Sequence, residues 1–181
     1  DKRKRLDRGL LCAWFSDDRL KTLVRHEIHP ICLDTNWGTR APAPGLNPDL
    51  YSVRYQGWIE IPEDDTYTFY LQAKTGGVLI ISSDLVCDAW DGTKSGFVNG
   101  NVTIDAGLYP MTVELYNVGT PGALKLYWST GRGKRSPVPG RLFHFDRLQA
   151  LEAKAIQPTK NDILLIQAEQ QKIRLGNPPK L

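Results

Sequence analysis

The amino-acid sequence predicts an all-β fold, an antiparallel β-sandwich or barrel, followed by a short C-terminal appendage of helical composition. Segments of alternating apolar and polar residues recur roughly every 8–12 residues, with turn residues between them. The 16 glycines and 12 prolines among 181 residues favour a turn-rich β architecture. Beyond Asp146 the composition shifts to Leu, Ala, Gln and Lys. We therefore expect a charged tail (residues 1–8), a β domain (9–146) and an appendage or linker to a following domain (147–181).

The first expected strand is the short apolar segment Gly9–Phe15. Residues 17–31 are charged and irregular, with no clean 3.6-residue periodicity. Asn36–Asp49 is expected to be a long loop because its prolines cannot donate ladder hydrogen bonds. Tyr51–Ile61 alternates, which predicts a half-buried strand. The later expected strands are residues 66–73, 76–82, 83–90, 101–118 and 123–129, and a short one near Leu142–Phe145.

The appendage is expected to contain two short helices, over residues 146–157 and 161–175, separated by Pro158. Either Asn161 or Asp162 could cap the second helix. The isoleucines of this helix form only a thin apolar stripe. We therefore expect it to pack on the sheet or on something outside this chain.

The charge pattern gives little support to several classes of partner. The net charge is only +3, and the basic run Lys2–Arg5 has no interleaved aromatic residue. We interpret this run as a solvated tail and expect no nucleic-acid binding. No apolar run approaches the roughly 20 residues of a membrane span, so we expect no direct membrane insertion, and no signal peptide is recognised.

The three cysteines, Cys12, Cys32 and Cys87, are too far apart for a CxxC metal or redox motif. Cys12 and Cys87 lie within apolar strand patterns and are expected to be buried small hydrophobic residues. A disulfide between Cys12 and Cys32 remains an alternative that the sequence does not decide.

No catalytic constellation is present, and we expect neither an enzyme nor a cofactor. The sequence has no G-x-S-x-G elbow, no phosphate-cradling loop and no H-E-x-x-H. His26 and His29 have the spacing of a helical metal pair, but their segment is not convincingly helical and no third ligand is evident. We therefore assign no metal site.

Several blocks, taken in order, resemble the PA14 family. They extend from Gly9 to about Phe145 and read GLLCAWFSD, NWGTRAPAPGL, YSVRYQGWIEIPEDDTYTFYL, DLVCDAW, AGLYPMTVELYN, GALKLYWS and SPVPGRLF. This family is named for the N-terminal part of anthrax protective antigen and occurs in bacterial glycosidases, yeast flocculins and other adhesins. The resemblance implies two antiparallel sheets and an extracytoplasmic location, secreted or at the cell surface. In many members it also implies a non-catalytic, lectin-like carbohydrate-binding module whose partners are glycans and the neighbouring domains of its parent protein.

The resemblance also implies a binding site, from which this sequence departs. Sugar-binding members carry two consecutive aspartates after the strand that matches TYTFYL, and the calcium ion held there grips sugar hydroxyls. Lys74 and Thr75, followed by Gly76, occupy the matching positions. An ammonium in place of a carboxylate makes a calcium site untenable, since calcium needs several oxygen ligands. Lys74 is then either a solvated turn residue of a domain that has lost binding, or a hydrogen-bond donor to sugar hydroxyls or a carboxylate.

The loop around Asn117 supplies the opposite side of the site in such relatives, although asparagine is also common in turns. Trp37 and Trp90 are expected at loop edges, where an indole could either stack on a sugar or be structural. We expect the remaining tryptophans to be core residues within strands: Trp14, Trp58 and Trp128.

Two further motifs have more than one interpretation. The basic run at Arg132–Ser136 fits a dibasic processing site, but we favour a solvated loop, with contact to an anionic ligand as the next choice. Asn101-Val102-Thr103 is a glycosylation sequon, expected on an exposed turn. Calcium-independent carbohydrate binding, as part of a larger adhesive or secreted protein, is the leading hypothesis. The alternative is a structural or protein-interaction module packed against a catalytic, adhesin or toxin domain.

Overall fold

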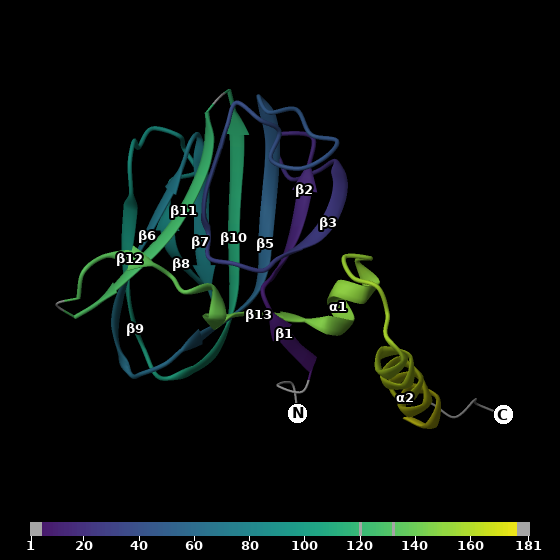
Figure 1. The fold of residues 1–181 in the computed structure, drawn as a ribbon. Helices are drawn as coiled ribbons and strands as arrows, with labels where there is room; N and C mark the ends of the chain where they lie inside the picture. Colours follow the sequence, from purple (N-terminus) through teal and green to yellow (C-terminus); the bar gives the residue numbers. More distant parts are fainter. Residues whose placement is uncertain (1–4, 120, 132, 177–181) are drawn as a thin grey trace.

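The computed structural model describes residues 5–119, 121–131 and 133–176, which form two antiparallel β-sheets packed face to face with two helices at the C-terminal end (Figure 1). The predicted all-β sandwich with a short helical appendage is confirmed. The larger sheet has eight strands and the smaller sheet has five.

The larger sheet is built around two long central strands, β5 and β10, which pair along their whole length. Its strand order is β1-β13-β5-β10-β7-β8, and β2 pairs with both β5 and β3. Its strands are β1 (Leu6–Arg8), β2 (Leu10–Phe15), β3 (Leu23–His29), β5 (Leu50–Ile61), β7 (Gly76–Ile81), β8 (Asp84–Asp88), β10 (Gly107–Val118) and β13 (Phe143–Asp146).

The smaller sheet has the order β12-β11-β6-β9, with β4 also paired to β11. Its strands are β4 (Asp34–Gly38), β6 (Asp65–Ala73), β9 (Val98–Ile104), β11 (Gly122–Thr130) and β12 (Ser136–Pro137). Both β6 and β11 bury every second residue, as their alternating sequences predict. One face of this sheet therefore packs on the core and the other faces outward.

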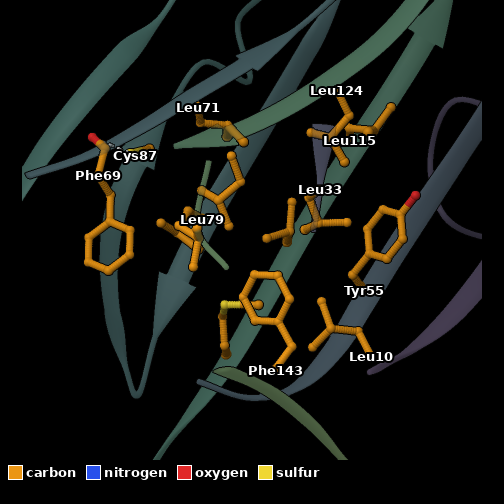
Figure 2. Close-up of a cluster of buried hydrophobic side chains, with 14 of the residues drawn as sticks. Leu10, Leu33, Tyr55, Phe69, Leu71, Leu79, Cys87, Leu115, Leu124 and Phe143 are labelled. Carbon is orange, nitrogen blue, oxygen red and sulfur yellow. Dashed lines mark hydrogen bonds between the residues drawn. The ribbon is translucent and has the colours of Figure 1, made fainter. Parts of the chain in front are cut away.

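The core lies between the two sheets and is filled by leucine, isoleucine and aromatic side chains (Figure 2). Phe69 and Leu71 of β6 face Leu79 of β7 and Leu115 of β10 across this layer, and all four side chains are buried. Burial of this kind stabilises the fold by about 1.5–3 kcal/mol for each large apolar side chain. The sandwich therefore has the single hydrophobic core expected of one domain.

Three strands fall at least partly where the sequence predicted a tail or a loop, or gave no clear pattern. Leu6–Arg8 was assigned to the tail but pairs with β13, and the basic residues 2–4 lie outside the described residues. Residues 17–31 include β3, which pairs with β2 alone among the described strands and has no fully buried residue. Such an edge strand needs no apolar alternation, so the residue pattern gave no signal for it. The loop expected over Asn36–Asp49 likewise begins within β4.

The appendage contains α1 (Arg147–Glu152) and α2 (Lys160–Gly176), as predicted. Both predicted caps for α2 were wrong, because the hydroxyl of Thr159 accepts from the N–H of Asp162 (3.3 Å). The carboxylate of Asp162 accepts from the N–H of Thr159 in return (2.7 Å), which completes a capping box. Asp162 also receives two hydrogen bonds from the guanidinium of Arg147, at 2.5 and 2.8 Å.

Arg147 joins the appendage to the β domain, since its guanidinium also donates to Asp7 of β1 (2.7 Å). Helix α1 packs on Leu11 and Phe145 through the buried Ala150. Helix α2 lies apart from both sheets in Figure 1 and exposes much of Ile163, Leu164, Ile173 and Leu175. Of the two expected packing partners, the sheet is therefore not the one that α2 contacts, and packing on something outside this chain stays a prediction.

Candidate functional site

Four loops meet at the end of the sandwich where β5 begins and β10 ends. The N–H of Gly119, just after β10, donates to the carbonyl of Asp49, just before β5 (2.8 Å). The side chain of Thr75, in the turn between β6 and β7, accepts from the N–H of Val118 (2.9 Å) and donates to its carbonyl (3.3 Å). The turn with Thr75 and the loop after β10 are thereby held together.

The loop after β8 is attached to the same place by Tyr116. Its hydroxyl donates to the carbonyl of Trp90 (2.7 Å), and its ring lies edge-on to the Trp90 indole with the ring centroids 4.8 Å apart. Gly76 lies beneath both residues, where a Cβ atom would collide with the Tyr116 ring. Only glycine fits at this position, so the turn that carries Lys74 is fixed against the loop that carries Trp90.

Lys74 is exposed at the tip of this turn and has no hydrogen bond or ion pair with any other described residue. The indole of Trp90 is half-buried, with its backbone N–H bound to the carboxylate of Asp88 (3.0 Å). The exposed Lys74 and the half-buried Trp90 therefore lie on two loops that contacts with Tyr116 and Gly76 hold together. We call Lys74, Thr75, Gly76 and Trp90 the Lys74 site.

The calcium ion of similar domains does not fit this arrangement. A calcium ion needs several oxygen ligands, whereas this turn offers the ammonium of Lys74, and the hydroxyl of Thr75 is already bonded to Val118. Within the described ranges no group of three or more His, Cys, Asp and Glu side chains is placed to hold a metal ion.

Asn117 belongs to this end of the sandwich but is fully buried. Its side-chain amide donates to the carbonyls of Pro48 (3.3 Å) and Gly119 (2.7 Å). Its carbonyl oxygen is buried without a hydrogen-bond partner among the described residues. The side chain therefore holds the loop after β10 against the loop before β5 and does not reach the surface.

The burial of the tryptophans agrees only in part with the prediction. Trp37 lies edge-on to Trp14 and Tyr51, at 5.8 Å from each, so its indole packs against the core. Trp14 and Trp128 are buried, as predicted. Trp58 is only partly buried on β5, between Pro110 and His144 of the flanking strands, so its assignment to the core was wrong.

The three thiols are free, so the alternative disulfide between Cys12 and Cys32 is not formed. Burial raises the pKa of the Cys87 thiol to about 12 and that of Cys12 well above its usual value. His26 and His29 lie on β3, where residues three apart point to opposite faces, so they cannot bind one metal ion together.

The role of Tyr116 was not foreseen from the sequence. It occupies an outward position of β10, between the buried Leu115 and Asn117, and anchors the loop of Trp90. An aromatic residue on the outward face at a strand end is the signal that could have indicated it. Asn101 of the sequon lies within β9 and not on a turn, so that expectation was wrong.

The fold and the Lys74 site define an antiparallel β-sandwich module whose loops converge at one end. The chain belongs to the PA14 domain family, whose family model matches residues 6–140. The anti-sigma-I factor RsgI3 of Acetivibrio thermocellus is 31% identical over 135 residues, which are 74% of this chain and 21% of that protein. This chain therefore spans about a fifth of that curated relative's length.

Two solved structures extend the comparison. An anti-sigma factor domain-containing protein from Clostridium clariflavum is 32% identical with a TM-score of 0.70, over 76% of this chain and 47% of that one. The epithelial adhesin 6 A domain of Candida glabrata, solved with Galb1-3GlcNAc, has a TM-score of 0.63 at 15% identity, over 86% of this chain and 90% of that one. The second likeness concerns the fold alone. No helix among the described residues is long and apolar enough to span a membrane.

Proposed function

We propose that this domain is a non-catalytic, calcium-independent carbohydrate-binding module of a larger secreted or cell-surface protein. The observation that carries the proposal is the free ammonium of Lys74 on a turn that Thr75 and Gly76 fix beside the half-buried Trp90. An adhesin domain of the same fold has been solved with a disaccharide, which supports the class of ligand.

The chemistry of the Lys74 site fits a weak sugar contact. An ammonium donates up to three hydrogen bonds, and sugar hydroxyls accept them. The indole of Trp90, at a half-buried position, would offer an apolar face to the C–H groups of a sugar. A few such hydrogen bonds, each worth about 0.5–1.5 kcal/mol, give affinities on the order of millimolar. Useful retention then requires a polymer that presents the same sugar repeatedly.

Retention on neutral polysaccharides in affinity electrophoresis tests this proposal. Lys74→Ala should abolish retention on any neutral polysaccharide that the wild-type protein binds, while the melting temperature stays within about 1 °C because an exposed turn residue contributes little to stability. The matched control is Lys172→Ala, which removes an exposed lysine from α2. Equal retention of wild type and Lys74→Ala on every bound polysaccharide would place the site elsewhere.

One observation favours the second candidate, a structural or protein-interaction module. Ile163, Leu164, Ile173 and Leu175 of α2 are 48–77% exposed, as expected of a helix that packs on a neighbouring domain. Hydrogen exchange of α2 in the parent protein tests this candidate. Strong protection of α2 there, together with no retention on any polysaccharide, would favour the interaction module over the carbohydrate-binding module.

A further inference from the structure

A second cluster of aromatic side chains lies on the outward face of the smaller sheet. Tyr70 of β6, Tyr127 of β11 and Phe97 just before β9 are all half-buried there. The ring centroids of Phe97 and Tyr127 are 5.3 Å apart, and those of Tyr70 and Phe97 are 6.3 Å apart. Neighbouring positions on the same strands fill the core, so these rings form a separate apolar strip on the solvent side.

Arg135 covers one end of this strip with a cation. Its guanidinium carbon lies 4.3 Å from the ring centroid of Phe97 and 5.3 Å from that of Tyr70. Its side chain is exposed and forms no ion pair within the described part of the chain. Contact with the two rings restrains the guanidinium, and its planar fork of N–H donors matches a carboxylate.

The charges around Arg135 favour an anionic ligand. Lys134 precedes it, and Lys125 lies on β11 two residues before Tyr127, on the same face of the sheet. The carboxylate of Asp34 already accepts a hydrogen bond from the Tyr127 hydroxyl (2.8 Å). Cations therefore outnumber carboxylates on this surface.

The rest of this sheet face carries hydroxyl and amide groups. Thr68 of β6 bonds Asn101 of β9 (2.8 Å), and the Tyr70 hydroxyl lies 3.3 Å from that of Ser129. Such groups both donate and accept, as sugar hydroxyls do. A groove that follows a nucleic-acid backbone would instead carry a continuous positive charge along its length. The side chains on this face therefore match a sugar polymer better than a nucleic acid.

We propose that Tyr70, Phe97, Tyr127 and Arg135 form a second binding surface, for a polysaccharide whose sugars carry carboxylates. Arg135 binds the carboxylate of one sugar through its two-pronged N–H edge, and the rings beneath it contact the C–H face of that sugar or its neighbour. The surface contains no residue of the Lys74 site. It would therefore bind acidic glycans even if the Lys74 site bound nothing.

Alginate, a polymer of uronic acids, and its carboxyl-reduced neutral form test this inference in calcium-free affinity electrophoresis. We expect wild-type protein to be retained on alginate and at least about tenfold more weakly on the reduced polymer. Arg135→Ala should lose about tenfold in alginate affinity, and Arg135→Lys should recover part of it because an ammonium keeps the charge but lacks the fork. The matched control is Arg174→Ala, which removes an exposed arginine from α2. Lys74→Ala should bind alginate like the wild type.

Three results would overturn the inference. These are equal retention of wild type and Arg135→Ala on alginate, loss of alginate binding in Lys74→Ala, and tighter Arg135-dependent binding to single-stranded oligo-dT than to alginate. A failure of Lys74→Ala to change retention on neutral polysaccharides would count against the Lys74 site alone.

Discussion

Thr75 and Val118 are joined by two hydrogen bonds although they are 43 residues apart. The Thr75 hydroxyl accepts from the N–H of Val118 at 2.9 Å and donates to its carbonyl at 3.3 Å. The pairing of β7 with β10 stops at Gly76 and Tyr116. Just beyond this point, the Thr75 side chain supplies two hydrogen bonds in place of the backbone bonds of the ladder. The turn that presents Lys74 is held to the sheet by this contact.

Replacing Thr75 with valine should loosen that turn without changing its shape. The N–H and carbonyl of Val118 would lose their partner but could bind water, since Val118 is half-exposed. We expect the free energy of unfolding to fall by about 0.5–1.5 kcal/mol, measured by urea titration. Thr75→Ser, which keeps the hydroxyl, is the matched control and should lose less. A Thr75→Val protein as stable as the wild type would show that these two bonds do not hold the turn.

Asn117→Ala should destabilise the fold more strongly. The variant leaves the carbonyls of Pro48 and Gly119 without their donor and opens a small cavity at a fully buried position. We expect a loss of about 1–3 kcal/mol in urea titration. The control is the exposed Asn99 of β9, whose replacement by alanine should cost less than about 0.5 kcal/mol. An unchanged stability combined with lost polysaccharide retention would instead make Asn117 a ligand contact.

Calcium should not stabilise this domain. A ligand that binds only the folded state raises the melting temperature once its concentration exceeds its dissociation constant. Lys74 and Thr75 supply no carboxylate at their turn, and the described residues contain no group of three or more His, Cys, Asp and Glu side chains placed to hold a metal ion, so we expect no shift at millimolar calcium. Thermal unfolding with calcium and then with chelator measures this. A rise of several degrees that the chelator reverses would contradict the assignment.

The thiols should differ in reactivity. Cys12 and Cys87 are buried and their thiol pKa values are raised, that of Cys87 to about 12, so little thiolate is present at neutral pH. Cys32 is half-buried. With Ellman's reagent we expect one of the three thiols to react in the native protein and all three in denaturant. Cys32→Ser should remove the fast reaction, and persistence of that reaction would show that another thiol is accessible.

The sequence predicted those strands that have one face on the core and the other in water. β6 and β11 alternate because one side contacts the core and the other contacts water, and this pattern is visible in the residues alone. β3 was missed because it pairs on one edge only and buries no residue fully. Its position depends on pairing with β2, a contact distant in sequence.

The candidate site was less predictable for a related reason. Asn117 looks like a turn residue in sequence, and only the approach of Pro48, 69 residues away, makes it a buried brace. Arg135 likewise belongs to a run that resembles a solvated loop, while its contact with Tyr70 and Phe97 depends on the packing of three separate segments.

Arg132 of the same run lies outside the described residues. Val138, just after the run, is buried in the core, so cleavage after Arg135 would cut the chain between β11 and a core residue.

The attachment of α2 should depend on pH through Asp162. Hydrogen bonds from Arg147, and then from Thr159, hold the pKa of this carboxyl well below its usual value. Because the folded pKa is lowered, the stabilisation is complete above the unfolded pKa of about 4 and is lost as the pH falls towards the folded pKa. We therefore expect wild type to exceed Asp162→Asn in unfolding free energy by a constant amount from pH 7 to about 5, and by progressively less below about pH 4. Asn161→Ala, at the exposed neighbouring position, controls for changes in the helix itself. Urea titrations of all three proteins from pH 7 to 2.5 measure these differences in unfolding free energy. A difference between wild type and Asp162→Asn that stays constant down to pH 2.5 would show that the ionised carboxylate does not hold α2 in place.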